Sequence, residues 1–301
     1  MKNKITLGHF AAFITIFIWG TTFISTKVLL NVLTPIEILF IRFLIGYIVL
    51  WCIYPHQLKI THKIEEFYFI AAGLCGITLY YLFENIALTY TLASNVGVII
   101  SIAPFFIVIF ACLFLHEKKP GIRFFIGFII AMIGIYLISF SDSQLQFNPL
   151  GDCLAIIAAI IWAAYSTLTK KLASFHHHII QTTRRTFFYG LLFMLPLTFL
   201  MGFDVNISQV MMPVNFLNLL FLGVGASALC FVTWNLAVRI LGSVKTSVYI
   251  YIVPVITAVT STLILHEKMT TMTILGIIFT LTGLFLSENR EKEKITNEYT
   301  K

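Results

Sequence analysis

Ten stretches of this chain run for sixteen residues or more without a single Asp, Glu, Lys or Arg. A helix needs about 20 mostly apolar residues to cross a bilayer core of roughly 30 Å. Only 11% of the residues are charged and 59% are hydrophobic, whereas soluble domains carry roughly 25% charged residues. Such a chain cannot cover an aqueous surface with polar groups, so its solvent must be lipid. We predict an all-α integral membrane protein.

The two longest charge-free stretches each hold more than one element. Asn85–Leu115 contains the end of one helix, a turn near Thr91–Asn95 and a second helix, whereas Val205–Val238 begins with a polar loop. With these divisions the natural count is ten transmembrane helices. The predicted helices cover residues 8–28, 35–54, 67–88, 94–115, 121–140, 150–171, 178–201, 215–238, 245–265 and 271–288.

Basic residues lie on alternate connections between these helices. With the N-terminus in the cytoplasm, fifteen Lys and Arg residues fall in cytoplasmic segments, whereas the external side holds only Lys268 and, at a helix end, Lys27. This asymmetry follows the positive-inside rule and predicts that both termini are cytoplasmic. The net charge of +7 therefore needs no nucleic acid to explain it. The fifteen residues are Lys2, Lys4, Lys59, Lys63, Lys118, Lys119, Arg123, Lys170, Lys171, Arg239, Lys245, Arg290, Lys292, Lys294 and Lys301.

Residues of the first half recur in the second half at nearly constant spacing. The pairs are Trp19 and Trp162, Lys27 and Lys170, Arg42 and Arg185, Asn85 and Asn235, Pro104 and Pro254, Gly127 and Gly276, Gly134 and Gly283, and the LHEK segments Leu115–Lys118 and Leu265–Lys268. Identities that hold a nearly constant register over this length indicate an internal repeat. Because each half has five predicted helices, an odd number, the second copy is inverted relative to the first.

The chain therefore divides into a first five-helix repeat at residues 1–145, a second, inverted five-helix repeat at 146–289 and a charged cytoplasmic tail at 290–301. Inverted repeats related by an axis in the membrane plane are a transporter design, with the substrate bound near mid-membrane between the halves. We expect a central cavity there.

The same residues carry a family resemblance. The segment Trp19-Gly-Thr-Thr-Phe, followed by Lys27, Arg42-Phe43, Asn85-Ile-Ala-Leu and Pro104, resembles the EamA-type family of the drug/metabolite transporter superfamily. The resemblance covers residues from about 10 to 288 in both halves. It implies ten helices in two repeats around a central cavity, export of amino acids and related metabolites, and a bacterial inner membrane location.

Two arginines occupy equivalent positions in the two repeats. Arg42 lies seven residues past Pro35, and Arg185 lies similarly far from the other membrane face. Charges inside a bilayer are costly and therefore point to function. A guanidinium fork suits a carboxylate or phosphate of a substrate. The alternative is a structural role, in which each arginine ties helices to backbone carbonyls or to Glu37.

Glu84 breaks the repeat, because Trp234 stands at the equivalent place. It also departs from the family pattern, in which a small or apolar residue is expected before the asparagine. A carboxylate among apolar helices suits recognition of a substrate amine or a proton relay. The alternative is a peripheral carboxylate that reaches the membrane surface or pairs with Arg42.

Aromatic residues near these charges are candidates for a cavity wall. Aromatic rings can hold an apolar or planar group, although most aromatics in membrane helices pack or lie at the interface. The expected substrate-binding set is Glu84, Trp19, Trp162, Tyr81, Trp234, Asn85, Asn235, Arg42 and Arg185.

The sequence contains no HExxH, Asp-rich diphosphate-binding or Walker A motif. We therefore expect neither enzyme activity nor a cofactor, and no primary pumping. The expected partners are a small-molecule substrate, the lipid bilayer and a coupling proton. The favoured function is secondary transport of an amino acid or related metabolite by alternating access. An organic-phosphate or nucleotide-derivative exchanger is the alternative, and a membrane enzyme or a channel is less favoured.

Overall fold

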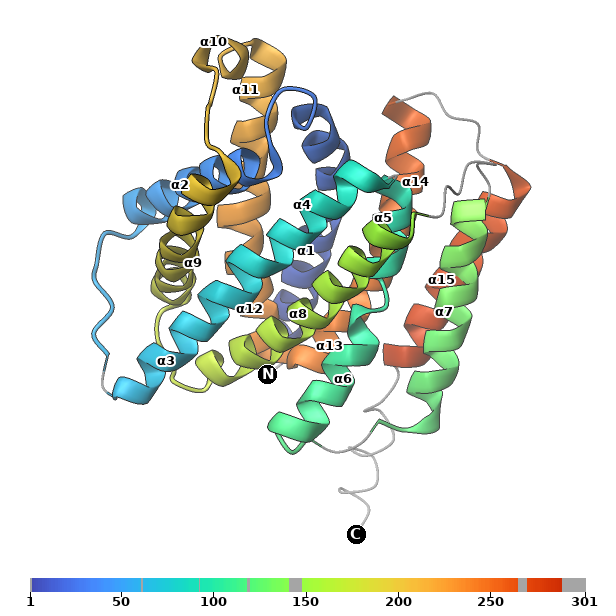
Figure 1. Cartoon of the computed structure of the whole chain (residues 1–301). Coiled ribbons are helices and arrows are strands. Elements are labelled where there is room, and N and C mark those ends of the chain that lie inside the picture. The colour runs from blue at the N-terminus through green and yellow to red at the C-terminus, as the bar shows by residue number, and fades with distance from the viewer. Residues whose placement is uncertain are drawn as a thin grey trace.

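The computed structural model describes residues 2–60, 62–91, 93–117, 120–140, 148–264 and 270–288, and within these ranges every regular element is a helix (Figure 1). The first half contains α1 (Lys2–Leu29), α2 (Pro35–Ile53), α3 (Lys63–Ala72), η1 (Gly73–Leu79), α4 (Tyr80–Tyr90), α5 (Ala93–Ile100), α6 (Ala103–Phe114) and α7 (Ile122–Phe140). The second contains α8 (Pro149–Ala173), α9 (Ile179–Met201), α10 (Ile207–Val210), α11 (Pro213–Leu220), η2 (Phe221–Leu229), α12 (Cys230–Leu241), α13 (Ser243–Ser247), η3 (Val248–Tyr251), α14 (Ile252–Ile264) and α15 (Thr271–Glu288).

Six helical segments of the described chain are long and apolar enough to cross a membrane. They are Lys4–Leu29, Pro35–Ile53, Lys63–Tyr90, Val96–Phe114, Pro149–Ala173 and Pro213–Leu241. Ile122–Ile138, Ser243–Thr257 and Thr271–Ser287 are shorter apolar helices. Helix α9 has 23 residues, but Arg184 and Arg185 in its first turns make it less apolar. The sequence ranges and the observed helices thus coincide closely, and the structure is that of a multi-pass membrane protein.

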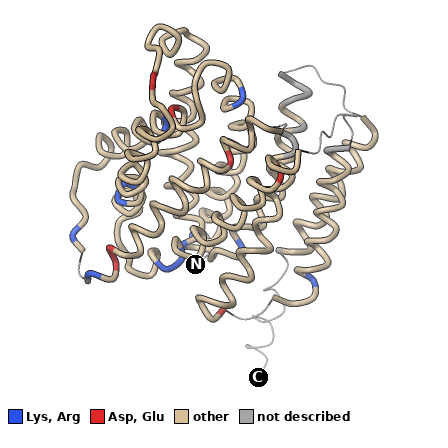
Figure 2. Tube along the Cα trace, in the orientation of Figure 1, with Lys and Arg blue, Asp and Glu red and all other residues tan. Residues whose placement is uncertain are grey.

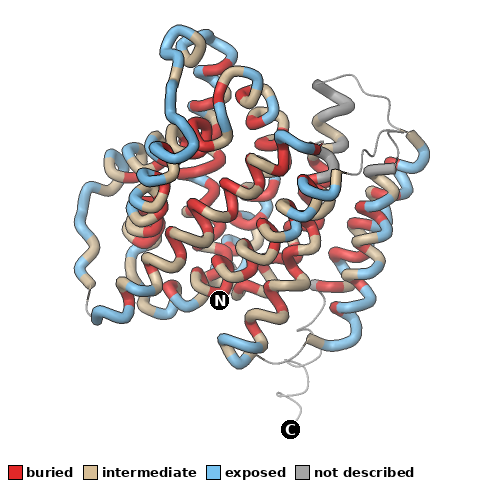
Figure 3. Tube along the Cα trace, viewed as in Figure 1, coloured by how far each residue is buried: buried red, intermediate tan, exposed pale blue. Residues whose placement is uncertain are grey.

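Charge and burial follow the pattern of a chain solvated by lipid. Basic residues gather mainly at the end of the bundle that holds the N-terminus (Figure 2). Large apolar side chains cover much of the outside, among them Phe199 and Leu200, which are 86% and 80% exposed. Buried residues form the inner faces of the helices (Figure 3). Lys118, Lys119, Lys268, the second LHEK segment and the predicted tail lie outside the described residues.

Two π-helical segments interrupt long helices at matching places. In the first half η1 runs directly into α4, and in the second half η2 runs directly into α12. The segments end at Leu79 and Leu229, which are separated by the same spacing as Asn85 and Asn235. π-Helical turns are rare and often occur at functional sites. Their matched occurrence marks the segments around Tyr80 and Cys230 as the place to look for a site.

A second pair of interruptions precedes two prolines. Helices α5 and α6 are separated at Ser101 and Ile102, just before Pro104, whereas the 3₁₀ segment η3 lies just before Pro254. Proline lacks the N–H that a continuous helix would use, so the helix breaks or kinks in the preceding turn. Both breaks lie in buried parts of the protein, where neighbouring helices rather than lipid surround the backbone.

Glycines bring α7 and α15 into backbone contact. A Cβ at Gly127 would lie 2.6 Å from the carbonyl oxygen of Gly283, and one at Gly134 would lie 2.6 Å from that of Gly276. The lower-numbered residue of one helix thus meets the higher-numbered residue of the other, so the helices are antiparallel (Figure 1). Small residues permit such close approach between membrane helices.

We expect Gly134→Ala to destabilise the protein. The new Cβ would lie 2.4 Å from the backbone nitrogen of Thr280, so α7 and α15 must separate. Overpacking of this kind costs about 1–3 kcal/mol. Thermal unfolding in detergent measures the loss. Gly121→Ala is the matched control, because no heavy atom lies within 4 Å of the added Cβ. Equal melting temperatures for the two variants would contradict the packing assigned to α7 and α15.

Candidate functional site

Three tryptophans from the two halves meet inside the bundle. Trp19 lies on α1, Trp162 on α8 and Trp234 on α12. The ring centroid of Trp19 is 5.2 Å from that of Trp162 and also 5.2 Å from that of Trp234. The centroids of Trp162 and Trp234 are 5.8 Å apart. Residues selected by the sequence repeat are therefore neighbours in space. We call these residues the tryptophan cluster.

The indole groups of the cluster have different hydrogen-bonding surroundings. The Trp19 Nε1–H donates to the backbone oxygen of Ala226, a residue of η2, at 3.0 Å. The Nε1 of Trp234 is buried and has no hydrogen-bond partner in the described structure. Because Trp19 is fixed by η2, the π-helical segment of the second half positions a side chain of the first.

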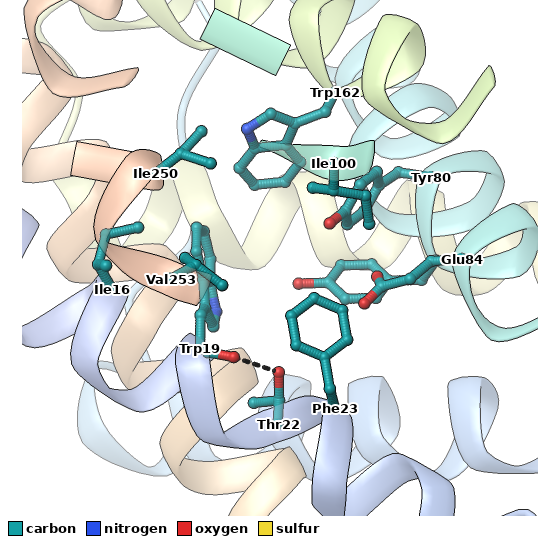
Figure 4. A pocket seen from close by; sticks show the side chains of 11 residues that line it. Ile16, Trp19, Thr22, Phe23, Tyr80, Glu84, Ile100, Trp162, Ile250 and Val253 are labelled. Atoms are coloured by element: carbon teal, nitrogen blue, oxygen red, sulfur yellow. Dashed lines mark hydrogen bonds between the residues drawn. The ribbon is translucent and has the colours of Figure 1, made fainter. Parts of the chain in front are cut away.

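A cavity lies beside Trp19 and Trp162. It contains about 430 Å³ of space not filled by atoms, including the part that is open to the outside. Figure 4 shows aromatic rings and the Glu84 side chain turned toward this space. The lining residues come from α1, α4, α5, α8, η3 and α14, and they are Ile16, Trp19, Thr22, Phe23, Tyr80, Tyr81, Glu84, Ile100, Trp162, Ile250 and Val253.

Glu84 brings the cavity its negative charge. The residue is 6% exposed, and its Oε2 atom is buried without a hydrogen-bond partner. Tyr80, four residues earlier on α4, also lines the cavity. A buried carboxylate oxygen without a donor is costly unless a ligand or a proton satisfies it. Glu84 is thus the lining group most in need of a partner.

Arg42 is not among the described lining residues, but its guanidinium lies over the ring of Tyr81, which is. The guanidinium carbon is 4.5 Å from the centroid of the Tyr81 ring and 5.3 Å from that of Phe43. Its Nε donates to the hydroxyl of Ser227 in η2 at 3.1 Å, and its Nη2 atom has no partner in the described structure. Arg42 therefore acts on Glu84 through space while its own contacts join α2 to η2.

The structure places Arg185 away from the cavity. Its Nε donates to Glu66 of α3 at 2.9 Å, and the Tyr189 hydroxyl contacts the same carboxylate. The neighbouring Arg184 is more deeply buried, with 5% exposure. It donates to the backbone oxygens of Tyr54 and His56 and lies over the Trp51 ring. The repeat drew attention to Arg185, yet Arg184 makes the more buried contacts.

The two asparagines join helices within their own halves. The Asn85 amide donates to the backbone oxygen of Pro35 at 3.3 Å, which links α4 to the start of α2. The Asn235 amide donates to the Thr183 hydroxyl at 2.9 Å, which links α12 to α9. Asn235 also accepts from the Tyr165 hydroxyl at 3.3 Å. Neither asparagine lines the cavity.

A polar network lies at the end of the bundle where α3 begins and α8 ends. His177 Nε2 is 2.7 Å from Glu65 Oε2, and Arg239 of α12 donates to the backbone oxygen of His177. His178 stacks on Tyr54, with centroids 4.2 Å apart. The loop after α8 thus contacts α2, α3 and α12. The sequence around His177 and His178 gives no sign of these contacts, because their partners lie far away along the chain.

Family and structural comparisons agree with one another. A model of the EamA-like transporter family matches residues 6–140 and, a second time, residues 149–288. A protein of known crystal structure shares the fold, with a TM-score of 0.77 at 17% identity, over 94% of this chain and 98% of that chain.

Relatives with assigned names are transporters. An uncharacterized transporter of Archaeoglobus fulgidus is 29% identical over 95% of this chain and 98% of its own length. An uncharacterized transporter of Clostridium kluyveri is 26% identical over 95% and 94%, respectively. A probable terminal-alkyne amino-acid exporter of Streptantibioticus cattleyicolor is 24% identical over 72% and 71%.

We expect Arg184→Ala to destabilise the protein more than Arg185→Ala. Loss of Arg184 leaves two backbone oxygens without their charged donor, which costs about 1–3 kcal/mol. The Arg185 side chain is 36% exposed, and a pair of this kind contributes about 0–1 kcal/mol. Melting temperatures in detergent compare the two variants. The reverse order would contradict the contacts assigned to these neighbouring arginines.

Proposed function

The chain belongs to the EamA-like transporter family, and on this premise we propose that it exports a small polar metabolite with an ammonium group, an amino acid or related compound, by alternating access. One observation carries the substrate part of the proposal. The aromatic cavity holds a single carboxylate whose buried oxygen lacks a partner. A named relative is a probable exporter of an amino acid, which supports the same class and direction.

We propose that the architecture is ten transmembrane helices in two inverted repeats, residues 1–145 and 146–289, with a charged tail at 290–301. The family model matches each half separately. The π-helical segments and the helix breaks before Pro104 and Pro254 recur at one spacing. The glycine contacts make α7 and α15 antiparallel, as an inverted repeat requires.

The cavity lies on the side of the tryptophan cluster where α1 and α4 end. Lys27, near the end of α1, donates to the Leu88 backbone oxygen near the end of α4 at 2.6 Å, so these two helix ends meet. Phe23 and Glu84 lie toward this end, whereas the polar network of His177 lies at the other. With a cytoplasmic N-terminus, this arrangement corresponds to a cavity on the external side and a closed cytoplasmic side.

Transport then requires the two ends to open in turn. The polar network must separate for a substrate to enter from the cytoplasm, and the tryptophan cluster must part to admit it to Glu84. Glu84 can then release either the substrate or a coupling proton to the external side. A carboxylate that binds one or the other, and not both, links the two movements.

The cavity argues against an organic-phosphate exchanger. None of the eleven described lining residues is Lys, Arg or His, whereas phosphate recognition relies on such groups. The three-dimensional arrangement likewise gives no support to an enzyme or a channel. The proposed location is a bacterial inner membrane, and the proposed partners are a small-molecule substrate, the lipid bilayer and a coupling proton.

The proposed topology predicts that the loop after α8 faces the cytoplasm and the loop before α11 faces outward. Ser174 and Ser208 are exposed residues of these two loops. In a background without the five native cysteines, an impermeant thiol reagent added to intact cells should label Ser208→Cys and spare Ser174→Cys. Both should react after the cells are opened. External labelling of Ser174→Cys would overturn the topology.

We expect Glu84→Gln to abolish transport driven by a proton gradient. The amide keeps the shape of the carboxyl group and removes both its charge and its proton. Counterflow of labelled amino acids and metabolites in proteoliposomes first identifies a substrate for the unchanged protein. Uptake with and without a pH gradient then separates the two roles of the carboxyl group.

Survival of exchange without a gradient in Glu84→Gln would assign the proton role, and loss of binding would assign ammonium recognition. Asp204→Asn is the control, because Asp204 is an exposed loop carboxylate. Full transport by Glu84→Gln under both conditions would show that Glu84 has neither role.

A further inference from the structure

The described polar groups that line the cavity include a negative charge and no positive charge. Glu84 contributes a carboxylate, and none of the described lining residues contributes a cation. The remaining polar groups are neutral, and two of them are already engaged. The Thr22 hydroxyl donates to the backbone oxygen of Trp19 at 2.7 Å, and the Trp19 Nε1–H donates to the backbone oxygen of Ala226 at 3.0 Å.

The nearest basic side chains are held outside the cavity. Lys27 is engaged by the backbone oxygens of Leu88 and Thr91, at 2.6 Å and 3.3 Å. Arg42 is 1% exposed and contacts Ser227 and the Tyr81 ring. Tyr81 is one of the described lining residues, whereas Arg42, which lies over the Tyr81 ring, is not. A free carboxylate placed here would therefore be desolvated without a charged partner, which is costly.

A cation bound in the cavity would instead lie among groups that attract it. Trp19, Trp162, Phe23 and Tyr80 present aromatic rings to the same space as the Glu84 carboxylate (Figure 4). Aromatic faces attract ammonium groups, most strongly where water is excluded. The carboxylate supplies the full opposite charge, and its buried Oε2 atom is without a protein donor.

We propose that the substrate of this cavity is an organic monocation, an amine or alkylated ammonium compound without a free carboxylate. This inference rests on the proposed transport function and narrows its substrate class. An amino-acid derivative whose carboxyl group is removed, esterified or amidated fits the site, whereas the parent zwitterion does not.

The charge of the site is consistent with exchange for a proton. The described lining of the cavity carries no net charge when Glu84 is protonated. It carries the same net charge when Glu84 is ionised and a monocation is bound. Binding of either partner therefore leaves the buried region with equal charge, and a one-for-one exchange needs no further buried ion.

Four small ligands that share one aromatic ring test the inference: phenethylamine, phenylalanine methyl ester, phenylalanine and 3-phenylpropionate. Binding to the purified full chain is followed by tryptophan fluorescence, since Trp19 and Trp162 line the cavity. We expect the amine and the ester to bind with similar Kd, phenylalanine to bind at least ten-fold more weakly, and 3-phenylpropionate not to bind.

The variants separate the cavity from nonspecific binding. Glu84→Gln should weaken amine binding at least ten-fold, and Phe23→Leu should weaken it to a smaller extent. Asp204→Asn should leave it unchanged. The melting temperature of each variant shows whether it is folded. The milder Phe23→Leu variant provides a second binding measurement if Glu84→Gln does not fold.

Counterflow with the same ligands distinguishes this inference from the proposed transport function. If phenylalanine is exchanged and binds as tightly as phenethylamine, the inferred substrate class is wrong and the proposed transport function still holds. Binding of the amine without exchange would support the inference and contradict transport of this class. Binding of none of the four ligands would overturn the inference outright.

Discussion

Backbone hydrogen bonding in lipid is the constraint on which this structure depends. The hydrocarbon core offers no water to an unpaired N–H or C=O, so a spanning segment must satisfy its backbone internally or against other protein groups. Long regular helices meet this demand wherever the chain faces lipid. The departures at η1, the α5–α6 break and η3 lie mostly among buried residues, and η2 buries one face while Val224 and Leu229 on the other face are exposed. Irregular backbone thus occurs where neighbouring helices can accept it, and the cavity is found beside it.

The π-helical segments have a direct consequence for the site. One residue more per turn than in a regular helix changes the direction of every later side chain by about 100°. In the first half this change comes immediately before Tyr80, Tyr81 and Glu84, three residues that line the cavity. In the second half η2 instead holds Trp19 and Arg42 through Ala226 and Ser227. The same local distortion therefore aims the site residues in one half and supports them in the other.

Local patterns in the sequence predicted the helices and selected Glu84, Trp19 and Trp162, which line the described cavity, because apolar stretches and repeated residues are visible along the chain. Contacts between residues that are distant in sequence could not be predicted from these patterns. The repeat selected Arg185, although Arg184 makes the buried contacts with the end of α2. The Glu65–His177 contact and the apolar cavity residues carry no local signal, since an isoleucine that lines a cavity resembles one that packs. The positions of Asn85 and Asn235 outside the cavity were equally invisible.

The two halves of the sequence differ at the position of Glu84, and this difference bears on the described cavity. Trp234 stands where the repeat places the counterpart of Glu84, and it is fully buried with its ring 5.2 Å from that of Trp19. The large indole fills its side of the interface, whereas the smaller carboxyl group of Glu84 leaves space beside Trp162. A symmetric pair of carboxylates would create two buried charges that repel one another. Tryptophan at one of the two positions avoids that repulsion and leaves Glu84 as the one carboxylate among the described residues that line the cavity.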